Sequence, residues 1–329
     1  MKTGTIRWFE TPSMSVNTDL RVLHLVTAEE IFFKQQIETL EQKGVDCTVL
    51  VVPGAEQIDG DMAAKRGVKE YLQFFPQVRR ELRTGEYDLI HANYGLTAPY
   101  AVTQFKLPVV LTLWGSDVVG FDGLVTKACA WRADAVTVRS EEMRELLGRE
   151  DAYIVPSGID MEKFRPIDRT VARERVGWDV DGTHVLFPYS PEYERKNYPL
   201  AQRVVADVEA ELGREITLLT ISGVDHSEVP YYMNAADCVL LTSDHEGSPN
   251  TVKEAMACNV SVVSTDVGDV RERLDGVSPG GVGSDVEKLS ELLSAVLNGE
   301  CRSNGREAVR EVSWDRIGDR IASIYTEVV

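Results

Sequence analysis

Short runs of β-branched and aliphatic residues alternate with helical stretches along almost the whole chain, and this alternation constrains the fold more than any other feature. The apolar run "RVLHLV" at 21–26 is followed by a helical pattern that ends at Gly44, and then by a second apolar run at 45–53. Runs of this length between helices are typical of parallel strands that are buried on both faces. The alternation therefore predicts an α/β protein with doubly wound, Rossmann-like sheets.

The same pattern divides the chain into two series. Over 152–168 the periodicity gives way to "AYIVPSGIDMEKFRPID", which is rich in Pro, Gly and charge, so we place a domain boundary there. We expect an N-terminal domain over 1–157 and a C-terminal domain over 158–329, with the final helix at 314–329 packing back on the first domain. Expected strands lie at 21–26, 45–53, 87–92, 108–114, 134–140, 183–190, 215–222, 237–243 and 260–265, and expected helices at 30–44, 61–84, 95–105, 121–132, 198–212, 229–236, 249–258 and 314–329.

The charge balance narrows the class of protein. The chain has 329 residues, enough for two domains, and its 53 acidic against 35 basic side chains give a formal net charge of −18. This excess argues against nucleic-acid binding, because phosphate contacts need clustered cations. The basic residues are 24 Arg and 11 Lys, and we interpret few lysines with a large acidic excess as adaptation to high salt. An ordinary acidic cytosolic protein is the alternative that stays open.

Cysteine usage and hydropathy indicate neither an exported nor a membrane-spanning protein. The five cysteines are far apart and contain no C-x-x-C pair, so neither a disulfide framework nor a zinc site is indicated. No run approaches the roughly 18 apolar residues of a membrane span, and the opening residues lack a cationic start followed by an apolar stretch. We expect a cytoplasmic protein. Composition leaves open a peripheral contact with the inner face of the membrane, and it does not indicate the oligomeric state.

The stretch "HEGSPNTVKEAMACNVSVVS" at 245–264 combines a turn, a helix and a strand. We expect Ser248 to cap the helix and Pro249 to occupy its first position, where an N–H would have no helical partner anyway. The amides of Asn250 and Thr251, at the positive end of the helix dipole, then face the ligand side of the sheet. This arrangement predicts a phosphate site at the start of the helix.

Two glutamates flank this predicted phosphate site. A carboxylate beside a diphosphate repels it, so Glu246 and Glu254 suit hydroxyl groups on either side of the phosphates. Glu254, inside the helix, is placed to reach a ribose, and Glu246, before the helix, a transferred sugar. The alternative is that Glu246 only favours the helix dipole and that Glu254 is a solvated surface residue.

The longer stretch "HEGSPNTVKEAMACNVSVVSTDVGD" closely resembles the signature of the retaining glycosyltransferases of family 4, in which two glutamates separated by seven residues precede a small-residue helix and a strand. Four further stretches resemble family elements in the expected order: "DLIHANYG", "LTLWGSDV", "IVPSGIDMEKFRP" and "RKNYPLA". The resemblance implies the GT-B fold, in which two Rossmann-like domains face each other across a cleft. It also implies sugar transfer from a nucleotide-diphosphate donor to a hydroxyl of a glycan, a lipid-linked sugar or a small molecule.

The resemblance assigns the donor side to the C-terminal domain. Lys196, together with Arg195, is implied to neutralise the diphosphate and the charge that grows on it as the sugar leaves. Glu254 is implied to bind the ribose, and Glu246 the hydroxyls of the donor sugar. The donor-binding residues expected on this basis are Arg195, Lys196, Glu246, Gly247, Ser248, Asn250, Thr251 and Glu254, of which Lys196 and Glu246 are also expected to be catalytic. A cation pair at a helix start is otherwise most often a solvated face.

The acceptor side is implied to lie at strand ends of the N-terminal domain. His91 follows the strand "YDLI", where family members use a histidine near the donor sugar and the acceptor, so we expect it to be catalytic. A structural role is the alternative for a lone histidine. The acceptor-side candidates are Asn93, Gly115, Ser116 and Asp117. Gly115 permits close approach of a ligand to the backbone, and Asp117 is placed to orient a hydroxyl.

The chemistry implied by the resemblance is front-face transfer, in which the leaving diphosphate takes the proton of the acceptor. It needs no protein nucleophile, which agrees with the lack of a G-x-S-x-G elbow or a recognisable Cys/His pair. We expect no cofactor and no essential metal. The "DVD" at 179–181 resembles the metal-binding aspartates of another fold, but it lies in a turn that contains glycine.

The chain departs from the family pattern in three places. "VTAEEIFF" stands where many members have a glycine pair, Asn93 stands in place of a second histidine, and the second domain lacks room for one strand and helix near the base pocket. The last departure leaves UDP and GDP donors open. Two other functions also stay open: a nucleotide-sugar epimerase of the same fold, and a catalytically silent binding protein that regulates a partner. Release of an epimerised nucleotide sugar without acceptor would identify the first, and absence of both nucleotide binding and transfer the second.

Overall fold

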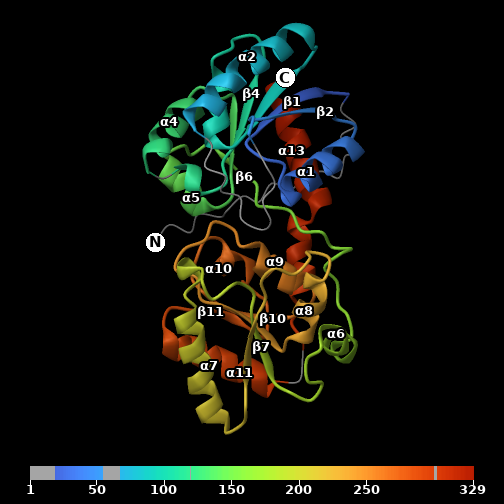
Figure 1. Ribbon diagram of the computed structural model, residues 1–329, viewed down its shortest axis with the longest axis vertical. Helices are drawn as coiled ribbons and strands as arrows, with labels where there is room; N and C mark the ends of the chain where they lie inside the picture. The colour runs from blue at the N-terminus through green and yellow to red at the C-terminus, as the bar shows by residue number, and fades with distance from the viewer. Residues whose placement is uncertain (1–18, 55–66, 119, 300–301) are drawn as a thin grey trace.

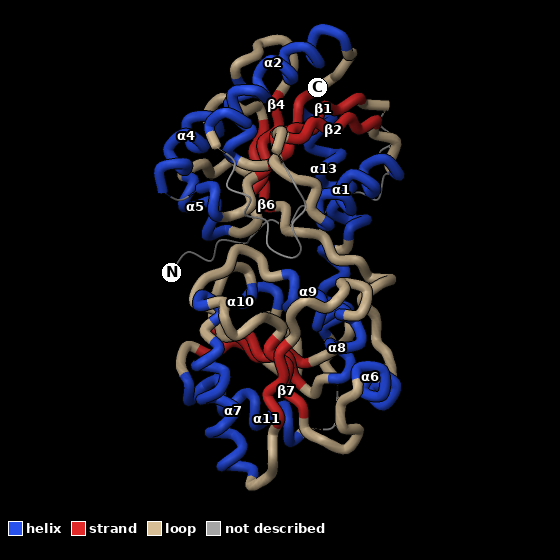
Figure 2. Tube along the Cα trace, in the orientation of Figure 1, coloured by secondary structure: helices blue, strands red, loops and turns tan. Residues whose placement is uncertain are grey.

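The computed structural model describes residues 19–54, 67–118, 120–299 and 302–329. They form two parallel β-sheets, one of six strands and one of five, at opposite ends of an elongated molecule (Figure 1). Helices surround both sheets, as the connections between parallel strands require (Figure 2). The predicted α/β class with two doubly wound, Rossmann-like sheets is confirmed. Among the described residues, no helix is both long and apolar enough to cross a membrane.

The six-stranded sheet is built from the N-terminal part of the chain. Its strands are all parallel in the order β2-β1-β3-β4-β5-β6, and β3, β4 and β5 are buried along their whole length. Burial on both faces is the reason why aliphatic residues predominate in these strands, although β3 also buries His91 and Asn93. The strands are β1 (Arg21–Val26), β2 (Asp46–Val51), β3 (Leu89–Asn93), β4 (Val109–Thr112), β5 (Ala135–Val138) and β6 (Tyr153–Ile154). The helices are α1 (Ile31–Gln42), α2 (Val68–Thr84), the short η1 (Gly95–Thr97), α3 (Ala98–Val102), the short η2 (Ser116–Val118), α4 (Gly120–Ala130) and α5 (Glu141–Leu147).

The five-stranded sheet follows in the order β11-β10-β9-β7-β8, again with all strands parallel. The strands are β7 (His184–Phe187), β8 (Thr217–Thr220), β9 (Cys238–Leu241), β10 (Ser261–Thr265) and β11 (Gly281–Gly283). The helices are α6 (Arg169–Val176), the short η3 (Glu194–Lys196), α7 (Tyr198–Leu212), α8 (Val229–Ala235), α9 (Asn250–Ala257), α10 (Val270–Arg273), α11 (Val286–Asn298), α12 (Gly305–Val309), the short η4 (Arg310–Val312) and α13 (Trp314–Val328).

Local signals explain where α7 begins and ends. The side chain of Asn197, which is in the left-handed region (φ 53°), accepts a hydrogen bond from the backbone N–H of Leu200. Gly213, also left-handed (φ 62°), ends the helix. The residues that face the core recur at helical spacing: Ala201, Val204, Val205 and Val208. The bounds of this helix match the sequence prediction.

The last helix, α13, packs on the N-terminal sheet although it ends the chain. It lies beside α1 (Figure 1). Lys43, which follows α1, forms ion pairs with Asp315 at 2.8 Å and with Asp319 at 2.6 Å. Tyr325 of α13 is fully buried. Segments from the two ends of the chain therefore share one core.

The chain crosses between the two sheets twice, and the two crossing segments are hydrogen-bonded to each other. The backbone N–H of Ile159 donates to the carbonyl of Val312 at 2.9 Å, and the carbonyl of Ile159 accepts from Trp314 at 3.1 Å. A side chain on Gly158 would collide with the ring of Trp314. The glycine of "PSGID" is therefore required by this close approach.

Candidate active site

Two loops that carry predicted donor residues meet where the strand order of the C-terminal sheet reverses. Strands β7 and β9 are neighbours there, with β8 on one side and β10 and β11 on the other. In open α/β sheets, ligands bind beyond the carboxyl ends of the strands at such a switch point. Lys196 follows β7 and Glu246 follows β9, and Nζ of the lysine lies 2.5 Å from Oε1 of the glutamate. The structure thus brings these two predicted residues together.

This ion pair is largely shielded from solvent, since the side chains of Lys196 and Glu246 are 19% and 15% exposed. The lysine Nζ lies 3.7 Å from the ring centroid of Tyr189. The hydroxyl of Ser243 donates to Oε1 of Glu246 at 2.7 Å. Reduced contact with water strengthens these interactions and fixes their geometry. A cation and a carboxylate are therefore held ready side by side.

Helix α9 begins near this pair, and its positive end has no side-chain cap. The prediction that Ser248 caps the helix is wrong, because Pro249 holds the N-cap position and Ser248 Oγ donates to Asp269 Oδ2 at 2.8 Å. The competing carboxylate draws the serine away from the helix amides. Thr251, in the first turn, lies 2.8 Å from the hydroxyl of Tyr189 through its Oγ1. An uncapped first turn retains its capacity to bind an anion.

Glu254 lies within α9 and is not a solvated surface residue, since only 9% of its side chain is exposed. Its Oε1 lies 3.4 Å from Nε2 of His226, whose Nδ1 is 2.6 Å from Nζ of Lys163. Burial lowers the pKa of Lys163, and the charge of Glu254 opposes this lowering. Burial raises the pKa of Tyr189, and the charges of Glu246 and Glu254 raise it further. Tyr189 is therefore a neutral hydroxyl within electrostatic reach of both glutamates.

The loop that carries Glu246 contacts the N-terminal half. A Cβ on Gly247 would lie 3.6 Å from the carbonyl oxygen of Trp114 and 3.9 Å from Sδ of Met143. Gly268, in the left-handed region (φ +54°), packs so closely behind this loop that a side chain there would collide with the Gly247 carbonyl. We call the contact between Gly247 and Trp114 the seam. Of the predicted donor residues, Gly247 lies at this seam, with Glu246 and Ser248 on either side of it in the chain.

His91 lies inside the N-terminal half and not beyond the end of its strand. Strand β3 runs from Leu89 to Asn93, so His91 lies within it, as the strand expected over 87–92 implies, and does not follow it. The ring is fully buried, with Nδ1 2.5 Å from the hydroxyl of Tyr325 and Nε2 2.6 Å from Oγ1 of Thr112. Burial lowers the pKa of His91 well below its usual value. Protein partners for both ring nitrogens favour the structural alternative, and the catalytic role stays a prediction.

Two acceptor-side candidates, Asn93 and Asp117, also form hydrogen bonds with other residues of the protein. The side-chain amide of Asn93 donates to the His91 carbonyl at 3.2 Å, and its oxygen accepts from Gln36 at 3.2 Å. Asp117 is 1% exposed, and burial raises its pKa although its hydrogen bonds oppose the rise. Its carboxylate accepts from the backbone N–H groups of Gly95, Trp114 and Gly115. In this arrangement, Asn93 joins β3 to α1, and Asp117 holds the loops at the strand ends.

The remaining predicted residues are more open. Gly115, in the left-handed region (φ +139°), has free space where a Cβ would stand, so its backbone is open to a close approach. The side chain of Ser116 lies outside what the structure describes. Arg195 is exposed at the rim of the donor residues, and its backbone carbonyl accepts from Asp244 at 2.9 Å.

Sequence reasoning missed three residues that join the donor site: Tyr189, His226 and Lys253. Lys253 is fully buried, and its Nζ donates to the carbonyl of Ser157 at 3.0 Å and to Ser248 Oγ at 3.1 Å. Burial lowers the pKa of Lys253 to about 8. It ties α9 to the first crossing segment. The usable signals were a tyrosine two residues after a buried strand and a lysine among apolar positions of a helix.

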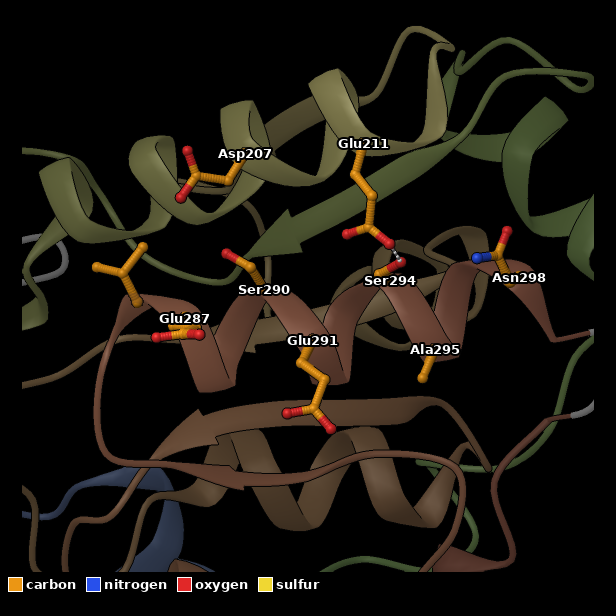
Figure 3. Close-up of a pocket in the computed structure, with 9 residues that line it drawn as sticks. Asp207, Glu211, Glu287, Ser290, Glu291, Ser294, Ala295 and Asn298 are labelled. Atoms are coloured by element: carbon orange, nitrogen blue, oxygen red, sulfur yellow. Dashed lines mark hydrogen bonds between the residues drawn. The ribbon is translucent and has the colours of Figure 1, made fainter.

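A surface hollow of about 610 Å³ lies elsewhere, between α7 and α11 (Figure 3). Its lining contains no predicted site residue but four carboxylates: Asp207, Glu211, Glu287 and Glu291. Glu211 accepts a hydrogen bond from Ser294 at 2.9 Å across the hollow. This concentration of negative charge disfavours a nucleotide diphosphate. The candidate active site is therefore the seam and not this hollow.

The structure has two Rossmann-like halves, and a lysine–glutamate pair lies at the switch point of the C-terminal half, on the side of the N-terminal half. This combination is that of the GT-B glycosyltransferases. The family model described as Glycosyltransferase Family 4 matches residues 30–163, and the model described as Glycosyl transferases group 1 matches residues 194–298. The chain belongs to this glycosyltransferase family and is an enzyme of that kind. The resemblance to family 4 and the GT-B fold, predicted from the motifs, is confirmed.

Named relatives agree with this assignment. A Bacillus subtilis protein named as the teichuronic acid biosynthesis glycosyltransferase TuaC is 24% identical over 302 residues, covering 74% of this chain and 78% of the relative. The D-inositol 3-phosphate glycosyltransferase of Geodermatophilus obscurus is 26% identical over 306 residues, covering 74% of this chain and 67% of the relative.

Solved structures with the same fold include two that cover nearly the whole chain. Sucrose-phosphate synthase from Thermosynechococcus elongatus superposes with a TM-score of 0.71 at 18% identity, covering 93% of this chain and 98% of that one. Anabaena HepE in complex with UDP and glucose superposes with a TM-score of 0.66 at 16% identity, covering 94% of this chain and 100% of that one. At these identities the similarity shows the fold.

Proposed function

We propose that the enzyme transfers a sugar from a UDP- or GDP-linked donor to a hydroxyl of a glycan, a lipid-linked sugar or a small molecule, with retention of anomeric configuration. The observation that carries this proposal is the Lys196–Glu246 ion pair at the switch point, near the uncapped start of α9. A cation and helix amides suit a diphosphate, and a carboxylate suits sugar hydroxyls. A single site thus offers both kinds of partner that a nucleotide sugar needs.

The proposed donor complex uses contacts that the free protein already organises. Lys196 and the amides of Asn250 and Thr251 bind the diphosphate, with Arg195 at the exposed rim. Glu246 binds the hydroxyls of the transferred sugar. Glu254, beside His226, binds the ribose. When the donor binds, its charged and hydroxyl groups therefore replace part of the contact between Lys196 and Glu246.

The proposed reaction is front-face transfer. The bond between the anomeric carbon and the β-phosphate oxygen breaks while the acceptor oxygen bonds to the same face of the sugar. The proton of the acceptor hydroxyl passes to the leaving phosphate oxygen, so no side chain has to act as a nucleophile. Lys196 stabilises the negative charge that develops on the leaving group. Preorganisation by Tyr189 and Ser243 reduces the rearrangement needed during the reaction.

Neighbouring cations also lead us to propose that no metal is essential, since Arg195 and Lys196 supply positive charge at the diphosphate. Transfer that persists in EDTA would support this, and transfer restored only by added divalent cations would contradict it. A cytoplasmic location, in contact with the inner face of the membrane or free of it, stays part of the proposal and is tested by cell fractionation.

The decisive experiment screens UDP- and GDP-sugars for thermal stabilisation of the full chain, because a donor that binds only the folded state raises the melting temperature. UDP-sugars come first, since the structural neighbour HepE was solved in complex with UDP. A stabilising donor is then incubated with an acceptor library, and NMR of the product identifies the anomer. An inverted anomer contradicts retention, and an epimerised nucleotide sugar released without acceptor identifies an epimerase instead.

Substitution of the two glutamates separates their roles. We expect Glu254→Ala to raise the dissociation constant of the donor, because it removes a ribose contact made before and during transfer. We expect Glu246→Ala chiefly to slow transfer, because its contacts strengthen in the transition state. Glu194→Ala, on the exposed turn η3, is the matched control and should change neither quantity. Unchanged kinetics in both test variants would contradict the assignments.

A further inference from the structure

Arg139 directly follows β5 and is a buried cation with an open edge. Its side chain is 3% exposed, and its Nη1 donates to the carbonyl of Val155 at 2.8 Å. The guanidinium carbon lies 3.5 Å from the ring centroid of Trp114. Nε and Nη2 have no hydrogen-bond partner among the residues that the structure describes. Buried donors of a charged group rarely stay unsatisfied unless they serve a purpose.

The two open donors are the pair with which arginine binds an oxyanion. In this protein, Nε and Nη2 of Arg149 bind the two carboxylate oxygens of Asp151 at 2.9 and 3.1 Å. The same two atoms of Arg175 bind the two oxygens of Glu228 at 3.1 and 2.9 Å. These parallel donors match the spacing of carboxylate or phosphate oxygens. The open edge of Arg139 is therefore a preformed bidentate site.

The carboxylate whose charge acts on Arg139, that of Asp117, already has other partners. Asp117 accepts from the backbone N–H groups of Trp114 and Gly115 in its own loop and of Gly95 in the loop after β3. Burial lowers the pKa of Arg139 to about 9, and the charge of Asp117 opposes this lowering, so the guanidinium stays charged at neutral pH. Among the residues that the structure describes, no carboxylate pairs directly with this guanidinium.

Arg139 lies on the acceptor side of the seam. It follows β5, which pairs with β4 in the sheet. The loop after β4 carries Trp114 and the open Gly115. The ring of Trp114 also contacts Phe32 of α1, with centroids 4.6 Å apart. The donor diphosphate has its own proposed partners, Lys196 and the start of α9, in the other half. Trp114, which stacks on the guanidinium, is only partly buried.

We propose that Arg139 is the anion-binding residue of the N-terminal half, and that the acceptor of this enzyme carries a phosphate or carboxylate that the Nε–Nη2 edge of Arg139 holds. This inference rests on the proposed function, because it assumes that the donor binds in the C-terminal half. An anion on the acceptor satisfies the buried charge and sets the orientation of the hydroxyl that receives the sugar. Neutral acceptors lack that contact.

The test measures anion binding after the donor site is filled. The full chain is saturated with UDP, and inorganic phosphate, glucose 6-phosphate, glucuronate or glucose is then titrated while the melting temperature is followed. We expect glucose 6-phosphate or glucuronate to raise the melting temperature and glucose not to do so. Arg139→Gln and Arg139→Lys should each weaken the effect at least about tenfold, because both lose the bidentate edge. Arg144→Gln, on α5 and paired with Glu141, is the matched control and should leave it unchanged.

The outcomes separate this inference from the proposed function. UDP affinity is measured first by calorimetry, and a chain that binds neither UDP nor GDP fails the proposed function itself. If UDP binds normally but no anion adds stabilisation, or if Arg139→Lys responds like the unaltered chain, the inference is overturned. A tenfold loss of UDP affinity in Arg139→Lys would place the residue in the donor site and would also overturn it. Preference for glucose 6-phosphate over glucuronate, or the reverse, identifies the anion.

Discussion

The two halves of the molecule use the polar residues at their strand ends in opposite ways. In the C-terminal half, Lys196 and Glu246 hold each other in an ion pair at the switch point, and their side chains keep a small exposed fraction. In the N-terminal half, His91 and Asp117 are buried, and their polar atoms bind other parts of the protein. The C-terminal half is thus arranged to exchange an internal contact for a ligand. The N-terminal half uses the same kinds of residue to hold its own loops.

What covers each half accounts for the difference. Helix α13 returns from the far end of the chain and places Tyr325 against His91, across 234 residues of sequence. The switch point of the C-terminal sheet faces the seam instead, where the Gly247 loop meets Trp114. A strand-end residue therefore becomes a ligand-binding or a structural residue according to the element that packs over it.

The largest effect expected from this comparison is on donor binding. Replacing Lys196 by Ala removes a charge-assisted contact to the diphosphate, worth up to about 3 kcal/mol, or about 100-fold in the dissociation constant of the donor. Calorimetry with the donor identified in the thermal screen measures this. Arg203→Ala, on the exposed side of α7, is the control for loss of positive charge. An affinity within about twofold of the unaltered chain would remove Lys196 from the site.

Lowering the pH should reduce the stability of the N-terminal half. Burial lowers the pKa of His24 to about 3 and that of His91 well below its usual value, so the folded state keeps both rings neutral. Histidines in the unfolded chain take up protons below about pH 6.5. Stability from the two neutral rings is therefore fully present above that pH and is lost progressively as the pH falls below it. From pH 7.5 to 5.5 we expect a loss of up to about 2.5 kcal/mol in the free energy of unfolding, measured by urea denaturation.

A control identifies the histidines as the source. His24→Phe should roughly halve the dependence on pH, because it removes one of these two buried histidines. Phenylalanine is chosen because His24 already packs edge-on against Phe33, with ring centroids 6.0 Å apart. His245→Gln alters an exposed histidine and should leave the dependence unchanged. Equal pH profiles for all three proteins would contradict neutral burial of the ring.

A smaller effect should separate stability from donor binding. Tyr325→Phe removes the hydroxyl that contacts Nδ1 of His91 and leaves a buried ring nitrogen without its partner, at a cost of about 1.5 kcal/mol. Tyr153→Phe removes a hydroxyl that donates to Glu327 at the exposed edge of the same helix, and it should cost less than about 0.5 kcal/mol. Donor affinity should be unchanged in both. Loss of donor affinity in Tyr325→Phe would instead support the catalytic prediction for His91.

Sequence patterns predicted the elements whose limits are set locally. Helix α7 was predicted over its full length because its first residues and Gly213 carry the start and end signals. Strand β6 has two residues and exists through its pairing with β5, so no run of residues marked it. Helix α11 was missed although Asp285 caps it through a hydrogen bond from Lys288. The domain division at 157 stays a prediction.

The same distinction applies to the candidate site. Glu246 and Glu254 belong to one short motif, so their common loop and helix were visible in the sequence. His91 and Asn93 depend on partners from distant elements, and no spacing rule indicates that Tyr325 covers one of them. Ser248 was predicted as a cap because the rule considers the helix alone, whereas Asp269 competes for its hydroxyl. Local motifs located the donor residues, and tertiary packing decided the rest.

The smallest effect concerns salt, which should also distinguish the two halves. Residues 158–329 hold 31 acidic and 18 basic side chains, a net charge of −13, whereas residues 1–157 hold 22 and 17, a net charge of −5. Repulsion is concentrated where α7 and α11 face each other across Asp207 and Glu287 (Figure 3). If the chain is adapted to high salt, raising KCl from 0.1 to 2 M should stabilise it by about 1 kcal/mol, because screening removes repulsion between exposed charges. The double variant Asp207→Asn/Glu287→Gln should be more stable at low salt and gain less from KCl.

The double variant Glu38→Gln/Glu41→Gln, on exposed positions of α1, carries the same change of charge into the N-terminal half and should alter the response less. An equal response of both variants would mean that the repulsion is spread over the whole chain, and no stabilisation by KCl would leave an ordinary acidic protein.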